Sequence, residues 1–384
     1  MKLSTRNLVA RPAFLVGLLA VGAAGFELSF TAIPDQDDST LQARADAVTA
    51  YLQSYINSTC GVDVPVVYSA VSDYDAAVDA LLDGTADFGW YGGLTGVQAG
   101  LRSPPAVYLA QRVEDKQFTS VFIQGSGLDL SAEGIQGANS RSLAFGSGSS
   151  TSGHLMPAYY MSEADPEVMP ASTIFTGSHD ATVDAVADGS VEVGALNSVV
   201  WENRVAANTT GGTSVFYTTP EYADYLWVSG AAIAMDWEMS VAEIAPLGSR
   251  VWPEECVDIH SLLTDAFLAA SADEPLGAAL LETYSAPNGF VSIEPHEYDP
   301  IFESGCDLDL IEEQYCVEPL PDDLGEGTDG EMADEDTNDD EKDGTGNMDD
   351  EEEEMMDTNT GFATNEALSL AFIVGTAAFN IIGL

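Results

Sequence analysis

Hydrophobic and polar positions alternate along residues 28–91 in a way that predicts a strand–helix–strand–helix–strand unit. Residues 41–56 and 74–82 carry apolar side chains at helical spacing, and Gly84 follows as a stop signal. Three short apolar runs are typical of buried strands: 28–33, 64–68 and 86–91. This order predicts a parallel sheet flanked by helices.

The same rhythm returns between residues 142 and 196. The pattern predicts a helix over 181–187 that ends at Asp188-Gly189, and strands at 142–145, 173–175 and 191–196. The segment ALLDGTADFGW (80–90) is echoed by AVADGSVEVGA (185–195). We therefore expect an α/β fold with two similar lobes and a cleft between them. Ligands of open α/β sheets bind at the carboxyl ends of the strands.

Both ends of the chain differ from this body. Residues 1–25 have the basic start, the short apolar run and the small residues of a secretory signal peptide, with an uncleaved anchor as the alternative. Residues 321–357 hold 19 acidic residues and one lysine, which predicts a disordered acidic stalk. Residues 358–384 end in an apolar run and are interpreted as a GPI-type signal or a membrane anchor.

The net charge of −53 argues against polyanionic partners and makes the binding of a small anion harder to explain. Nucleic acid and anionic lipid are not expected to bind, because both need basic surfaces. The body at 26–320 has 44 acidic and 7 basic residues, so an anionic ligand would have to be attracted by local groups.

Four cysteines in an exported chain predict two disulfides. Cys306 and Cys316 are close enough in sequence to close a small loop, which would leave Cys60 with Cys256. Four cysteines allow three pairings, so the spacing does not decide between them. Their spacing does not match a zinc site, and we expect neither a metal nor a cofactor.

The segment Gly146-Ser-Gly-Ser-Ser-Thr-Ser-Gly-His154 is the most informative one chemically. It follows a predicted strand and leads into a predicted helix at 155–161. A helix N-terminus offers backbone N–H groups and a positive dipole end to an anion, and serine and threonine hydroxyls add neutral donors. The alternative is a flexible loop with a simple cap. The segment lacks the GK[ST] of a P-loop and the GxSxG of a nucleophile elbow.

Two further side chains are candidates for the same site. His179 lies between a predicted strand and a predicted helix, where an imidazole N–H can bind an anion oxygen. Tyr74 begins a first-lobe helix, from which its phenol could reach across a cleft. The alternatives are a histidine that caps a loop and a tyrosine that packs in the core.

The chain resembles the phosphate/phosphite/phosphonate-binding proteins of bacterial ABC transporters, the PhnD-like group with the type 2 periplasmic-binding fold. The resemblance covers about residues 28–290. The matching stretches occur in the family's order: Thr31–Asp37, Asp73-Tyr74, Asp87–Gly92, Ser149–Gly153 and Gly177–Thr182.

The resemblance implies roles for individual residues. Ser150, Thr151 and Ser152 would cradle the phosphoryl oxygens. Tyr74 from the opposite lobe and His179 would contact the same group, and Asp224 would hold the amino group of an aminoalkyl phosphonate.

Two departures from the family pattern change the expected ligand. A second tyrosine falls at Phe118, which has no hydroxyl, and a further acidic residue falls near Val199, with only Asn197 close by. We therefore expect a small oxyanion such as phosphite, phosphate or methylphosphonate rather than 2-aminoethylphosphonate.

The prediction is a secreted or surface-tethered solute-binding protein that closes on its ligand by a hinge motion and is not an enzyme. Lobe 1 is expected at 26–117 and 225–320, and lobe 2 at 118–224. A membrane transporter or receptor would be its partner, with the C-terminal tail on the membrane. A surface sensor on the same fold is the alternative. A hydrolase with a Ser152–His179 pair is a further one, but it lacks an orienting motif.

Overall fold

The computed structural model describes residues 27–231, 233, 237, 256, 258–294 and 296–316. These all belong to one compact unit, residues 1–329. The predicted signal peptide, the acidic stalk and the C-terminal tail lie outside the described residues. Within the described part, no helix combines the length and the apolar character needed to span a membrane.

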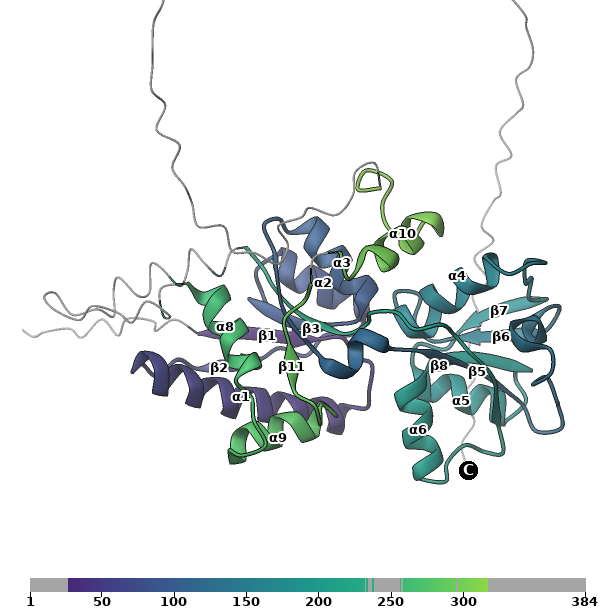
Figure 1. Cartoon of the computed structure of the whole chain (residues 1–384), viewed down its shortest axis with the longest axis horizontal. Helices are drawn as coiled ribbons and strands as arrows, with labels where there is room; N and C mark the ends of the chain where they lie inside the picture. The colour runs from purple at the N-terminus through teal and green to yellow at the C-terminus, as the bar shows by residue number, and fades with distance from the viewer. Residues whose placement is uncertain are drawn as a thin grey trace, which may run out of the picture. The chain divides into compact units, whose positions relative to one another are not determined.

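One sheet has six strands in the order β11-β4-β10-β3-β1-β2. Its strands are β1 (Leu28–Ala32), β2 (Val66–Tyr68), β3 (Phe88–Tyr91), β4 (Val107–Arg112), β10 (Leu226–Ser229) and β11 (Phe290–Val291). Its helices are α1 (Asp38–Cys60), α2 (Tyr74–Leu82), α3 (Gly93–Arg102), α8 (Ile259–Leu268), α9 (Pro275–Thr283) and α10 (Asp299–Asp307). Figure 1 shows α1 and α9 on one side of this sheet and α2 and α3 on the other. This sheet and these helices are called the first lobe.

The second sheet has five strands in the order β7-β6-β8-β5-β9. They are β5 (Ser120–Gln124), β6 (Ser142–Phe145), β7 (Ser172–Phe175), β8 (Val193–Asn197) and β9 (Ser214–Thr218). With them lie the short helix η2 (Gly134–Ala138), the π-helical turn η3 (Thr151–Leu155), α4 (Met156–Ser162), α5 (His179–Ala187) and α6 (Ser198–Ala206). This sheet and these helices are called the second lobe.

Helix α1 shows why the periodic segments fold as predicted. Its apolar side chains at helical spacing are buried, as at Leu41, Val48 and Ile56. The Asp37 side chain caps the first turn by accepting two backbone N–H groups, and Gly61 ends the helix with φ 69°. The helix is longer than the predicted 41–56 because these caps lie outside the apolar pattern.

The strands predicted at 28–33, 64–68 and 86–91 pair in parallel as expected, but each sheet also contains antiparallel strands. β1 pairs in parallel with β2 and β3, and β6 with β7 and β8. However, β10 is antiparallel to β3 and β4, and β5 is antiparallel to β8 and β9. The chain passes from one sheet to the other and back, so a strand that returns from the second lobe enters the first sheet in the opposite direction.

Two segments connect the sheets, and they are hydrogen-bonded to each other. The first runs from β4 through the 3-10 helix η1 (Val113–Gln117) to β5, and the second runs from β9 to β10. Phe118 and Tyr222 form an antiparallel bridge with both backbone hydrogen bonds, at 2.9 and 3.0 Å. The Asp224 N–H also donates to the Asp115 carbonyl, at 3.1 Å. The predicted hinge motion between the lobes would take place at these two crossing segments.

Two disulfides fasten the first lobe. Cys60 pairs with Cys256 across a sequence separation of 196 residues, and Cys306 pairs with Cys316 across 10. They are called the long-range and the short-range disulfide. Each constrains the unfolded chain, the longer loop more than the shorter one.

Candidate functional site

The site is built where helices begin after strands of both sheets. α3 follows β3, η3 follows β6, α5 follows β7, and α6 follows β8. Each start leaves backbone N–H groups without a partner inside its own helix. The side chains predicted for the site lie on or beside these starts.

Ser150, Thr151 and Ser152 form the centre of the site and are at most 2% exposed. The Ser150 hydroxyl caps η3 by accepting the Gly153 N–H at 3.0 Å. Thr151 Oγ1 accepts the Leu94 N–H at 2.9 Å, so the start of α3 in the first lobe is bonded directly to the second lobe. The predicted helix start is in fact a π-helical turn, with α4 following from Met156.

Tyr74 reaches this segment from the first lobe. It is the first residue of α2 and is 4% exposed, and its phenol hydrogen-bonds the Ser150 side chain. Burial raises the pKa of Tyr74 well above its ordinary value, with the Asp35 carboxylate adding to the rise. The phenol is therefore a neutral donor across the physiological pH range.

His179 is the first residue of α5 and is 1% exposed. Its Nδ1 accepts the backbone N–H of Asn197 at 3.4 Å, which leaves the ring proton on Nε2. Nε2 is buried and has no hydrogen-bond partner within the described residues. Burial lowers the pKa of His179 to about 4, although the Asp35 carboxylate raises it. The ring is thus a neutral N–H donor. It lies close to Ser150, because Gly153 contacts both side chains.

Gly153 holds the imidazole against the serine segment. A Cβ atom at this position would lie 2.9 Å from both His179 Cε1 and Ser150 Oγ. Only a glycine allows the ring to approach so closely, because any larger residue would collide with both groups.

Asp224 lies in the second crossing segment and is fully buried. Its Oδ1 accepts the Gly93 N–H at 2.9 Å, at the start of α3, while its Oδ2 has no hydrogen-bond partner in the described part of the chain. Burial raises the pKa of Asp224 to about 7; the Gly93 hydrogen bond and the hydroxyls of Thr151 and Ser152 lower it. A neighbouring carboxylate, Asp115, raises it further.

The sequence predictions missed Tyr225 and the role of Asn197. The Asn197 Nδ2 donates to the Tyr225 hydroxyl at 2.9 Å, while its Oδ1 caps α6. The Tyr225 ring stacks on Trp90 at 5.6 Å, and the Arg112 guanidinium lies 5.2 and 5.4 Å from the two ring centroids. Through Tyr225, these contacts connect the aromatic core of the first lobe to Asn197, whose backbone N–H bonds His179. An aromatic residue after Asp224 was visible in the sequence, but its partners were not.

Phe118 occupies the place expected for a second tyrosine. It is 3% exposed and packs edge-on against Tyr225, with ring centroids 5.6 Å apart. The structure therefore places a ring without a hydroxyl next to the site. The neighbouring Val199 donates its backbone N–H to Asn197 Oδ1 and contributes no carboxylate.

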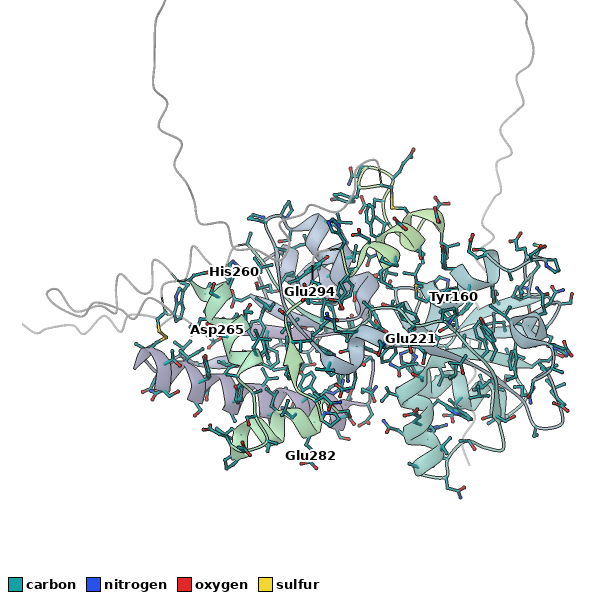
Figure 2. All side chains as sticks on the ribbon, viewed as in Figure 1. Tyr160, Glu221, His260, Asp265, Glu282 and Glu294 are labelled. Carbon is teal, nitrogen blue, oxygen red and sulfur yellow. A yellow bond between two sulfur atoms is a disulfide. The ribbon has the colours of Figure 1, made fainter. Side chains whose placement is uncertain are left out.

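No free cation serves the site within the described residues, because each lysine and arginine there forms an ion pair with a carboxylate. Exposed acidic side chains, among them Glu221, Glu282 and Glu294, lie on the outside (Figure 2). The donors that the described side chains present around Ser150–Ser152 are therefore neutral hydroxyl, imidazole and backbone N–H groups.

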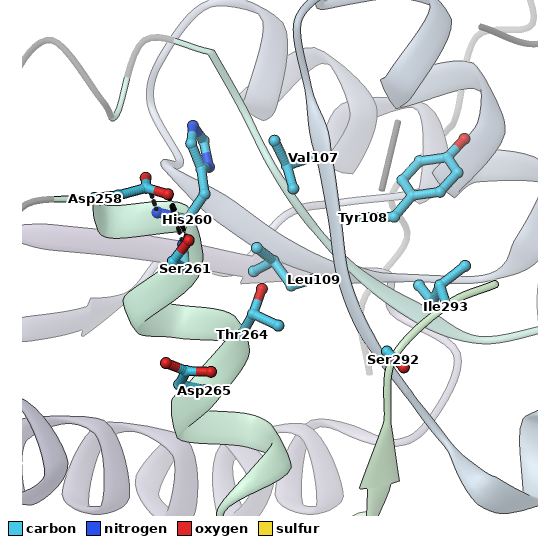
Figure 3. A pocket seen from close by; sticks show the side chains of 10 residues that line it. All are labelled: Val107, Tyr108, Leu109, Asp258, His260, Ser261, Thr264, Asp265, Ser292 and Ile293. Carbon is cyan, nitrogen blue, oxygen red and sulfur yellow. Dashed lines mark hydrogen bonds between the residues drawn. The ribbon is translucent and has the colours of Figure 1, made fainter. Parts of the chain in front are cut away.

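A separate pocket of about 150 Å³ lies between β4 and α8 (Figure 3). Asp258 and His260 in its lining have protein partners, whereas the buried Tyr108 hydroxyl has none within the described residues. Asp258 caps α8 by accepting the His260 and Ser261 N–H groups, and His260 Nδ1 is 2.6 Å from Ser229 Oγ.

Comparison with known proteins agrees with this geometry. Residues 30–298 match the model of a family described as ABC transporter, phosphonate, periplasmic substrate-binding protein. The chain belongs to this family. The predicted resemblance and the predicted two-sheet α/β fold are thereby confirmed.

Two curated relatives of this phosphonate-binding family are similar in sequence. A probable ABC transporter phosphite binding protein, PhnD1 of Prochlorococcus marinus, is 39% identical over 211 residues, which cover 53% of this chain and 69% of PhnD1. A phosphate-import protein, PhnD of Mycolicibacterium smegmatis, is 25% identical over 219 residues, which cover 50% of this chain and 66% of that protein.

Solved structures support the same fold. PhnD1 of Prochlorococcus marinus in complex with methylphosphonate superposes with a TM-score of 0.62 at 30% identity, over 74% of this chain and 98% of that one. A binding-protein component of an ABC phosphonate transporter from Pseudomonas aeruginosa gives 0.56 at 18% identity, over 74% of this chain and 87% of that one. The second likeness shows the fold alone.

The described contacts include no hydrogen bond between a serine hydroxyl and His179 of the kind a serine hydrolase uses. A serine nucleophile would need a hydrogen bond from its hydroxyl to a histidine base. His179 Nε2 has no such partner in the described residues, and its Nδ1 is occupied by Asn197. The described part also holds no group of metal-ligating side chains. What the arrangement offers is a set of fixed donors around one place, which suits binding.

Proposed function

We propose that this protein captures a small phosphorus oxyanion between its two lobes, as the solute-binding component of an ABC transporter. The single observation that carries the proposal is the convergence of Ser150, Thr151 and Ser152 with Tyr74 and His179. These side chains come from both lobes, are buried, and present neutral donors. Family membership and the methylphosphonate-bound PhnD1 structure support the same ligand class.

Phosphite, phosphate or methylphosphonate is favoured over 2-aminoethylphosphonate. An ammonium group would require several acceptors. Phe118 offers no hydroxyl, Asn197 Nδ2 is a donor bonded to Tyr225, and Asn197 Oδ1 already accepts the Val199 and Val200 N–H groups. An amino tail would therefore have Asp224 but would lack the further acidic residue that the family pattern has near Val199.

We propose lobe boundaries at 26–117 with 225–320, and at 118–224. The two segments that connect the sheets support this division. We also infer that the protein works outside the cytoplasm, held at a membrane by residues 358–384. The signal-like residues 1–25 and the periplasmic family description support this location.

Isothermal titration of the purified full chain tests the proposal. Phosphite, phosphate, methylphosphonate and 2-aminoethylphosphonate are titrated at pH 7 into the wild type, the double variant Ser150→Ala/Ser152→Ala, and the control Ser162→Ala, whose serine is exposed on α4. We expect sub-micromolar binding of one of the first three ligands, a loss of at least about a hundredfold in the double variant from two missing hydrogen bonds to a charged group, and no change in the control. A folded protein that binds none of them contradicts the proposal.

A further inference from the structure

Asp224 has a feature that the proposed oxyanion site does not explain. Its carboxyl is fully buried, and Oδ2 has no hydrogen-bond partner among the described residues. A buried carboxylate oxygen without a hydrogen-bond partner is costly, so its presence calls for an explanation. The carboxyl lies in the same cluster as Thr151, since a Cβ built at Gly92 would meet Thr151 Oγ1 at 3.1 Å and Asp224 Oδ1 at 3.4 Å.

The second unpartnered atom of the site, His179 Nε2, is a hydrogen-bond donor, whereas an ionised Asp224 Oδ2 is an acceptor. His179 Nε2 carries the ring proton because Nδ1 accepts from Asn197, so it can only donate. A complementary ligand must therefore offer an acceptor oxygen to His179. It must also meet Asp224 either with a hydroxyl, if that carboxyl is ionised, or with an oxygen, if it is protonated.

Resting on the proposed function, we infer that Asp224 and the bound oxyanion share one proton. A monoanion with a P–OH group donates that proton to ionised Asp224 Oδ2. A dianion accepts it from protonated Asp224. The two descriptions contain the same atoms and the same total charge, so the site takes oxyanions that can carry one exchangeable proton. A fully ionised anion such as sulfate binds only when Asp224 brings the proton.

The groups around Asp224 keep both forms accessible near neutral pH. Burial raises its pKa to about 7. The Gly93 N–H and the Thr151 and Ser152 hydroxyls stabilise the ionised form. The other titratable groups that act on Asp224, or on which it acts, are Asp115 of η1, Tyr74 of α2, Tyr222 and Tyr225 of its own segment, and Tyr298 beside α10.

Asp115 is bound by Arg112 Nε at 2.6 Å, so that carboxylate is occupied by an ion pair. The four phenols all have raised pKa values, chiefly through burial, and stay neutral. Asp224 is therefore the group in this cluster whose charge changes between pH 6 and 8.

The test is calorimetric titration of the full chain from pH 5.5 to 9 with methylphosphonate and with sulfate, in two buffers of different ionisation enthalpy. Above about pH 8 the ligand and Asp224 are both deprotonated, so binding must take up one proton and the affinity should fall about tenfold per pH unit. The buffer pair measures that proton directly. Sulfate affinity should already fall about tenfold per unit above pH 7.

Asp224→Asn provides a donor in place of the shared proton. The variant should lose the alkaline decline with methylphosphonate, and its sulfate affinity should become independent of pH. Asp188→Asn, which removes an exposed carboxylate at the C-terminal end of α5, is the control and should leave both profiles unchanged. If the asparagine variant does not fold, the proton count in the wild type still decides.

The outcomes separate this inference from the proposed function. Absence of binding to every phosphorus oxyanion at pH 7 contradicts the proposed function. Binding of methylphosphonate without proton uptake at pH 9 overturns the shared proton alone. Tighter binding of 2-aminoethylphosphonate, lost in Asp224→Asn while methylphosphonate affinity is kept, would assign Asp224 to an ammonium group and also overturn it.

Discussion

The buried ion pair beside the hinge allows a quantitative prediction. Arg112 binds both oxygens of Asp115 and donates to the Tyr284 carbonyl at 2.7 Å, and the two charged side chains are 6% and 0% exposed. In Asp115→Asn the guanidinium stays buried without its counter-charge. Removing one partner of a buried pair costs about 3–5 kcal/mol of unfolding free energy.

The matched control is the pair of Arg141 with Glu192 at 3.0 Å, whose side chains are 26% and 46% exposed. Solvent screens such a pair, so Glu192→Gln should cost less than about 1 kcal/mol. Urea denaturation of the ligand-free chain, followed by circular dichroism, gives the free energy of unfolding for each variant.

A third variant separates loss of the counter-charge from loss of packing. Arg112→Met/Asp115→Leu removes both charges, and we expect it to recover at least half of the stability lost in Asp115→Asn, because apolar replacement of a buried pair is often neutral. Equal destabilisation by Asp115→Asn and Glu192→Gln, at an unchanged denaturant slope, would refute the reasoning.

Three further predictions follow from the site and the disulfides. Gly153→Ala should weaken oxyanion binding by about tenfold or more through overpacking against His179, whereas Gly148→Ala, with nothing within 4 Å of its Cβ, should leave titration curves unchanged. Because the pKa of His179 is lowered to about 4, its contribution to stability is complete above pH 6.5 and is lost as the pH falls toward 4. About 3 kcal/mol should disappear over that range, and less in His179→Gln; equal pH profiles in acid denaturation would contradict this. Serine substitution of the long-range disulfide should cost about 5 kcal/mol and of the short-range one about 3 kcal/mol, and equal losses in urea denaturation would count against the loop-length argument.

Much of the local structure was predictable from residue order. The helices at 38–60, 74–82 and 179–187 follow from apolar side chains at helical spacing and from polar caps beside them. The serine segment after β6 was recognisable because hydroxyl-rich residues at a strand end precede a helical pattern. These features depend on neighbours within a few positions of one another.

The residues that pack around the site and position its side chains were not predictable in the same way. Tyr225 stacks on Trp90 and bonds Asn197, and these three residues lie on strands or strand ends that are distant in sequence. Similarly, the carboxylate of Asp224 was visible, but its unpartnered oxygen and its bond to Gly93 depend on how the crossing segment meets α3.

The sequence by itself determined the α/β class, the hydroxyl and imidazole donors of the proposed site, and the scarcity of basic residues that could attract an anion. Periodicity, capping and charge are properties of nearby residues, so they can be read along the chain. The tertiary structure alone decided that both sheets are mixed, that His179 carries its proton on Nε2, and that Asp224 is buried with one oxygen unpaired. Each of these depends on contacts between segments that meet only after folding, because desolvation and hydrogen-bond geometry belong to the assembled interior and not to any local stretch of sequence.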